Sequence, residues 1–71
     1  MMHMTWGTDV HAARAKPFDA DNVVPDDSVN DWVADFAYDN DADDYERINA
    51  HTWRITVPGD VLVVIVATPH N

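Results

Sequence analysis

Seventy-one residues suffice for one small domain, near the size at which a single hydrophobic core stabilises a fold only marginally. Thirteen acidic against four basic side chains give a net charge of −9, which excludes direct nucleic-acid binding through phosphate contacts and disfavours anionic membranes. There is no cysteine, so disulfides and thiolate metal sites are excluded as well.

The N-terminal segment has two interpretations. Apolar residues alternate before Gly7, at Met2, Met4 and Trp6. Residues 10–16 are alanine-rich and follow the capping pair Thr8-Asp9, which favours a short helix. A strand over about residues 10–18, bent near Gly7, fits almost as well. We favour the strand, because the apolar strand expected at the C-terminal end needs a second neighbour.

The clearest helix follows Pro25 and should run over about residues 28–38. Its apolar residues recur at i, i+3, i+4 and i+7, which places them on one face: Val29, Trp32, Val33 and Phe36. We expect its N-terminus to be capped by the side chains of Asp26, Asp27 and Ser28. The turn-forming residues 39–41 should end it. Trp32 is expected in the core, as is Trp53.

The last third of the chain predicts a helical turn and a hairpin. Residues 42–50 could form the turn, with Tyr45 and Ile48 facing inward. Apolar and polar residues then alternate over about residues 51–57, as in a half-buried strand. Pro58-Gly59-Asp60 should form a loose turn with Gly59 at positive φ. Residues 61–67 are apolar without alternation, which is typical of a central strand covered on both faces.

These elements predict an α+β fold: a single small domain, residues 1–71, with an antiparallel sheet of three or four strands. The strand at 61–67 would lie between its two neighbours, and the helix would pack on one face. One helix cannot cover both faces of such a strand. The second face would be covered by N-terminal residues (Met4, Trp6, Phe18), by a second copy in a homodimer, or by another partner.

The acidic residues are concentrated in one block. Between Lys16 and Arg47 there is no basic residue, but there are ten aspartates and Glu46. A surface of one sign repels itself, and we expect it to serve an external partner or medium. Within the expected helix, Asp27, Asp31 and Asp35 recur every four residues, a rise of about 6 Å per step. Such like-charged pairs destabilise a helix by about 0.2–0.5 kcal/mol each.

This spacing is comparable to that of phosphates along a nucleic-acid strand. We therefore predict an acidic protein-binding module that blocks the basic groove of a nucleic-acid-binding protein. The expected contact residues are the three helical aspartates and the acids that follow them: Asp27, Asp31, Asp35, Asp39, Asp41, Asp43, Asp44 and Glu46. Binding through such a surface would be fast and salt-sensitive.

In size, charge and helix-plus-sheet composition the chain resembles small acidic DNA-mimic inhibitors from bacteriophages, including some anti-CRISPR proteins. The resemblance is one of general character, without a shared motif, so no residue roles carry over. The alternative is a haloadapted archaeal protein whose acidity is a salt adaptation. The scarcity of glutamate and the concentration of charge in the middle third weigh against that alternative. An ordinary small domain from a GC-rich genome is the third reading.

No catalytic, metal or cofactor site is predicted. The only serine, Ser28, is better explained as a helix cap than as a nucleophile. Aspartates at 39, 41 and 43 match the start of an EF-hand loop, but Asp44 and Ala50 stand where the loop needs Gly and Glu. The four histidines have no metal-ligand spacing. The N-terminus does not resemble a signal peptide, and no apolar run would cross a bilayer, so we expect a soluble cytoplasmic protein.

Overall fold

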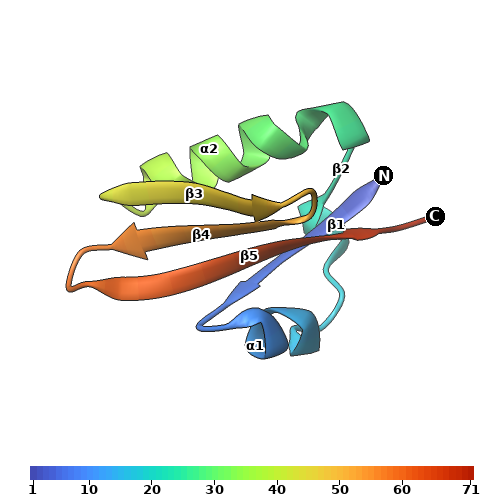
Figure 1. The fold of residues 1–71 in the computed structure, drawn as a ribbon. Helices are drawn as coiled ribbons and strands as arrows, with labels where there is room; N and C mark the ends of the chain where they lie inside the picture. The colour runs from blue at the N-terminus through green and yellow to red at the C-terminus, as the bar shows by residue number, and fades with distance from the viewer.

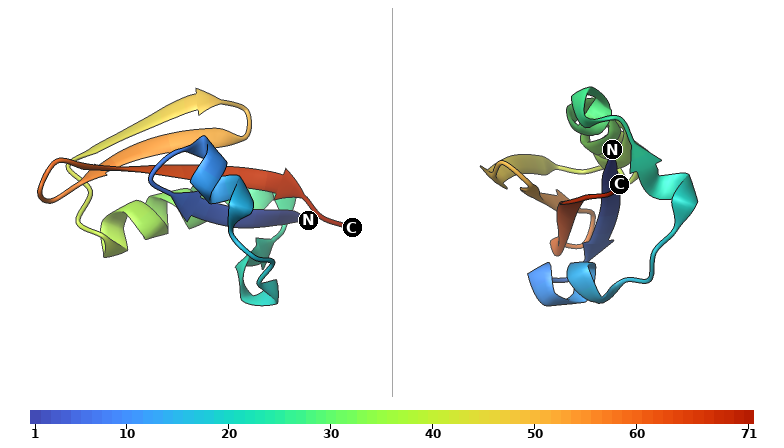
Figure 2. Two further views of the ribbon diagram at one scale, coloured as in Figure 1. Left: turned by 90° about the horizontal axis from the view of Figure 1, so that it is seen from below. Right: turned by 90° about the vertical axis from the view of Figure 1, so that its right-hand side faces the viewer.

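The computed structural model describes residues 1–71 and contains one five-stranded antiparallel sheet in the order β2-β1-β5-β4-β3 (Figure 1). Its strands are β1 (Met2–Gly7), β2 (Val23–Val24), β3 (Asp44–Asn49), β4 (Thr52–Val57) and β5 (Val61–Pro69). Helix α2 (Val29–Asp39) lies over one face of the sheet, and the short helix α1 (Val10–Ala15) lies on the other side (Figures 1 and 2). Two 3₁₀ turns, η1 (Ala20–Asn22) and η2 (Asp26–Ser28), flank β2. The α+β class is confirmed, but the sheet has five strands rather than three or four.

The C-terminal hairpin forms as predicted and is longer than expected. Val57 pairs with Val61, so the three residues between them form the turn. Gly59 has a φ of 92°, as predicted, and Asp60 also has a positive φ, of 60°. β5 lies between β1 and β4, as expected. It continues to Pro69 because β1 pairs with it from Val64 to Pro69.

The prediction of a strand over residues 10–18 is wrong. The strand that neighbours β5 is β1, formed by the alternating residues before Gly7, so the following segment is free to form α1. Asp9 caps this helix by accepting a hydrogen bond from the backbone N–H of Ala12 at 2.7 Å. A Cβ on Gly7 would lie 2.7 Å from the backbone nitrogen of Ala13. The missing side chain therefore allows α1 to sit directly on the sheet.

The predicted helical turn over residues 42–50 is also wrong. Most of this segment is β3, an edge strand that pairs only with β4. All six of its residues are exposed, including Tyr45 and Ile48, which were expected to face inward. The reason is not local: the outer edge of β4 offers backbone hydrogen-bonding groups, and β3 satisfies them.

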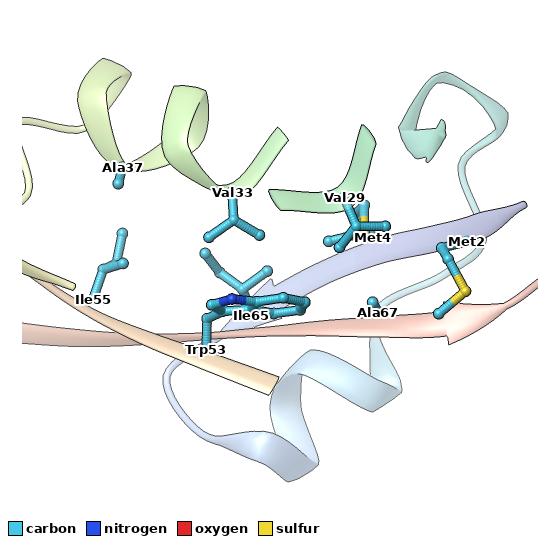
Figure 3. Packing of buried hydrophobic residues seen from close by; sticks show 9 residues of the cluster. All are labelled: Met2, Met4, Val29, Val33, Ala37, Trp53, Ile55, Ile65 and Ala67. Atoms are coloured by element: carbon cyan, nitrogen blue, oxygen red, sulfur yellow. The ribbon is translucent and has the colours of Figure 1, made fainter. Parts of the chain in front are cut away.

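The core lies between α2 and the sheet. Val29, Val33 and Ala37 point from the helix toward side chains of β4 and β5 (Figure 3). Trp53 is 1% exposed, which confirms its predicted place in the core. Trp32 is only half-buried and lies at the margin of the core, with its ring centroid 5.8 Å from that of Trp6.

The opposite face of the sheet is covered only in part, and by an element that we did not expect there. Met4 and Trp6 belong to the core side under α2, so the expectation that they cover the second face is wrong. Instead α1 lies against β1 and β5 and buries Ala13 completely. Leu62 remains 48% exposed. Neither helix is long and apolar enough to span a membrane.

Candidate functional site: the anionic face of α2

The two ends of helix α2 differ: its C-terminus closes in a hydrogen-bonded motif, whereas its N-terminus has no side-chain cap. At its N-terminus the Ser28 side chain makes no capping hydrogen bond, contrary to our expectation. The nearby Asp26 carboxylate instead pairs with the amino terminus at 2.8 Å. At the C-terminus the backbone N–H of Asp41 donates to Tyr38 and that of Ala42 donates to Ala37, at 3.1 and 2.9 Å. This pair of bonds is a Schellman motif, which ends the helix where the sequence predicted.

A row of carboxylates runs along the outside of α2. Asp31, Asp35 and Asp39 follow each other at four-residue steps and are all exposed. They come two residues after the buried row at Val29, Val33 and Ala37, which is about 200° around a helix of 3.6 residues per turn. Asp27 comes four residues before Asp31 in the sequence and lies in η2, before the helix. Asp41 and Asp43 follow in the turn after it.

Two of the eight predicted contact residues lie elsewhere. Asp44 and Glu46 belong to β3, where they pair with Thr56 and Arg54. Paired residues share one face of a sheet, and Arg54 alternates with the buried residues that face α2, so these acids point away from the helix. Glu46 also forms an ion pair with Arg54. We define the anionic face as the remaining six residues: Asp27, Asp31, Asp35, Asp39, Asp41 and Asp43.

The anionic face has no internal counter-ion. The two ion pairs of the molecule involve Asp26 and Glu46, which are not part of it. Lys16 lies over the ring of Trp6, 4.4 Å from its centroid. Arg47 donates hydrogen bonds to two backbone carbonyls, of residues 49 and 50, at 3.1 and 3.2 Å. Neither cation forms an ion pair with the anionic face, so the charge of the face is available to an external partner.

An aromatic residue that the sequence analysis missed lies within this face. Tyr38 is 85% exposed and borders an open depression together with Asp39, Asp41 and Ala42. In the sequence, Tyr38 falls outside the apolar row of α2. An aromatic residue on the polar side of a helix was the signal that could have identified it. A tyrosine combines a large apolar ring with a hydroxyl, and such residues often anchor protein–protein interfaces.

No group of three histidine, cysteine, aspartate or glutamate side chains is arranged to hold a metal ion. The histidines, which appear scattered in the sequence, are partly brought together: His3 and His51 line one hollow on the sheet face away from α2.

A comparison of the chain with protein-family models, curated proteins and solved structures finds no match.

Proposed function

We propose that the protein is an acidic binding module that docks its anionic face into the basic groove of a nucleic-acid-binding protein and thereby excludes nucleic acid. The observation that carries the proposal is the row of exposed, unpaired carboxylates at Asp31, Asp35 and Asp39 on a helix held by the core. Successive steps of this row rise about 6 Å along the helix. A regular array of fixed negative charges is what a groove built for phosphates would recognise.

The rigidity of the helix supports this function. Val33 is fully buried and Val29 and Ala37 nearly so, and the C-terminal end of the helix is closed by the two hydrogen bonds of its Schellman motif. A partner would therefore not have to order the helix on binding, which lowers the entropic cost of association. Charges held in advance also raise the rate of encounter with a cationic surface.

Tyr38 would supply the apolar part of the interface. Electrostatic attraction between exposed charges contributes modestly to affinity, whereas buried aromatic anchors contribute more. Tyr38 borders the same depression as Asp39 and Asp41 and is exposed over most of its area. Burial of this ring in the groove would add affinity that salt does not screen.

The arrangement also bears on the haloadaptation alternative. Hydration in concentrated salt requires carboxylates, but it does not require that they lie at regular steps along one side of a helix. Here six of the thirteen acids form the anionic face, while β4 and β5 contribute a single acid, Asp60, in the turn between them. This asymmetry favours recognition over solvation.

The test is capture of nucleic-acid-binding proteins from a lysate on the immobilised protein, followed by elution with duplex DNA. The variant Asp31→Asn/Asp35→Asn removes two charges from the anionic face. Its matched control, Asp21→Asn/Asp60→Asn, removes two exposed charges elsewhere. We expect the wild type and the control to capture a nucleic-acid-binding protein that DNA displaces, and the helix variant to lose it.

Equal loss of capture with both variants would show that net charge alone is responsible and would refute the proposal. So would capture of proteins that DNA does not displace. Far-UV circular dichroism in low salt and in molar KCl addresses the alternative. A chain that folds only in molar salt would support haloadaptation.

A further inference from the structure

A second surface of the molecule differs in chemistry from the rest. A hollow of about 560 Å³ opens on the sheet face away from α2. Its floor comes from β1, β5 and β4, while Arg14 of α1 and His51 of the β3–β4 turn stand at its sides. α1 and α2 lie on opposite sides of the sheet (Figure 2), so this hollow is separated from the anionic face by the sheet.

The lining of the hollow contains no carboxylate, although the chain has thirteen acidic residues. Each of the other three depressions on the surface includes at least one aspartate. The lining instead contains one of the four basic residues and two of the four histidines: Arg14, His3 and His51. Asn49 and three threonines complete the polar set, the threonines being Thr5, Thr52 and Thr68. Nearly every side chain that can form a hydrogen bond here can donate one.

Arg14 is the one basic side chain without a partner. Arg54 is paired with Glu46, Lys16 lies over an indole ring, and Arg47 bonds to backbone carbonyls. The guanidinium of Arg14 forms no ion pair, side-chain hydrogen bond or cation–π contact, and the residue is exposed at the rim of the hollow. Its five N–H donors are thus free for a ligand, and their planar fork suits the oxygens of a phosphate.

The hydroxyl groups on the floor are positioned by the strand register. Thr5 and Thr52 both pair with Val66, from its two sides, so the three residues form one row across the sheet. The Thr5 hydroxyl donates to the Val66 carbonyl at 3.4 Å. Thr52 is only 6% exposed, yet its hydroxyl has no partner in the protein. Because no enclosed polar side-chain atom lacks a partner, this hydroxyl must reach the open hollow.

His3 is held in a defined orientation. The backbone N–H of Asp19 donates to its Nε2 at 3.1 Å, which assigns Nε2 as the acceptor and leaves the proton on Nδ1. The ring of Phe18 packs against the imidazole with centroids 4.7 Å apart. His3 therefore keeps one N–H donor, at Nδ1, and is part of the lining of the hollow.

We propose that this hollow binds a phosphate-type oxyanion, with Arg14 as its charged ligand and His3, His51 and Thr52 as hydrogen-bond donors. The proposal is independent of the proposed function, because it concerns the other side of the sheet. Repulsion from the anionic face is weak at this site, since charges are screened over about 8 Å at physiological salt. The volume falls within the roughly 300–1,000 Å³ of small-molecule sites, which leaves room for a group attached to the phosphate.

The experiment is a titration of ¹⁵N-labelled full-length protein, followed by amide chemical shifts at constant ionic strength. One arm uses inorganic phosphate, a second uses the phosphomonoester glycerol 3-phosphate, and sodium chloride is the blank. We expect saturable shifts at the amides of Thr5, Thr52 and Thr68 with phosphate, and none with chloride. Tighter binding of the phosphomonoester would assign an esterified phosphate as the ligand, and equal or weaker binding would assign the free anion.

Two variants test the role of Arg14. Arg14→Gln should weaken phosphate binding at least about tenfold, the loss expected when a charge-assisted hydrogen bond is removed. Arg14→Lys should weaken it less, because the charge remains but the fork is lost. The control is Arg54→Gln, which removes the same charge from the same sheet face outside the hollow and should leave the affinity unchanged.

Non-saturating shifts, or shifts spread over the molecule, would overturn the proposal. So would equal weakening by Arg14→Gln and Arg54→Gln, because that result would reflect net charge rather than a site. Arg14 is exposed, so the variants should fold, and the amide spectrum recorded before titration verifies this directly.

Discussion

The residue Asp41 has a backbone conformation that suits glycine better than aspartate. Its φ is 54°, in the left-handed region, where a Cβ approaches the following carbonyl oxygen. It occupies the position after the last helical turn at which Schellman motifs usually have glycine. Its N–H and that of Ala42 nevertheless close both hydrogen bonds of the motif. The chain therefore accepts this strain to end α2 before β3 begins.

Replacement of Asp41 by glycine should stabilise the fold by two separate effects. Relief of the left-handed strain contributes about 0.5–1 kcal/mol, since aspartate tolerates this region better than most residues. Removal of a negative charge from the negative end of the helix dipole contributes about 0.3–1 kcal/mol more. The variant Asp41→Asn keeps the Cβ and removes only the charge. It should therefore gain the second contribution but not the first.

Urea unfolding followed by tryptophan fluorescence measures both variants, because Trp53 is buried in the core. With a slope of about 1 kcal/mol per molar urea for a domain of this size, Asp41→Gly should raise the midpoint by roughly 1–2 M. Asp41→Asn should raise it by roughly half as much, and the slope should not change. If Asp41→Gly is no more stable than Asp41→Asn, the left-handed conformation does not strain the native state and the reasoning fails.

Four further substitutions test the packing and charge of the molecule. Gly7→Ala should destabilise by about 1–3 kcal/mol in urea unfolding, because its Cβ would meet the backbone of α1 at 2.7 Å. Ile55→Val, at a position with no exposed area, should lower the free energy of unfolding by about 0.5–1.5 kcal/mol. Asp35→Asn should raise the unfolding free energy by about 0.4–1 kcal/mol, since it removes repulsion from neighbours one turn away on both sides, and molar NaCl should abolish the gain. Tyr38→Ala should change stability by less than about 0.5 kcal/mol while weakening capture of the partner in the lysate assay; unchanged capture would remove Tyr38 from the interface.

The elements that were predicted correctly are those whose signal is local. The stripe of α2 and the alternation of β4 are read from neighbouring residues, and the turn at Gly59 follows from its chemistry. The apolar, non-alternating β5 also indicated its central position, because only a strand with neighbours on both sides buries such a sequence. These features fixed the class of the fold.

The errors arose where the outcome depends on distant partners. Residues 10–18 carry signals for a helix and a strand, and the choice was decided by which segment paired with β5. β1 fills that place, so α1 is the result. β3 has no apolar face, so its sequence does not show the alternation that predicts a strand. It is a strand because the free edge of β4 is beside it.

The part of the candidate site that lies on one helix could be predicted from the sequence. Four-residue spacing places Asp31 and Asp35 on one side of α2 whatever the rest of the chain does. Asp44 and Glu46 could not be assigned in this way, because alternation along β3 turns them to the other face of the sheet. The hollow was not predictable at all. His3 and His51 are far apart in sequence, and they line the same hollow because β1 and β4 both pair with β5.

The net charge of −9 therefore describes the chain less well than the positions of its charged side chains. On one side the core holds α2 with its carboxylates outward and unpaired. On the other side Arg14 faces a hollow without acids. Repulsion within the anionic face is weaker when salt screens it, whereas the geometry of both surfaces is set by packing and register. If the acidity were only an adaptation to salt, the anionic face would need negative charge but no particular geometry. The hollow beside Arg14 would then have no role in that adaptation.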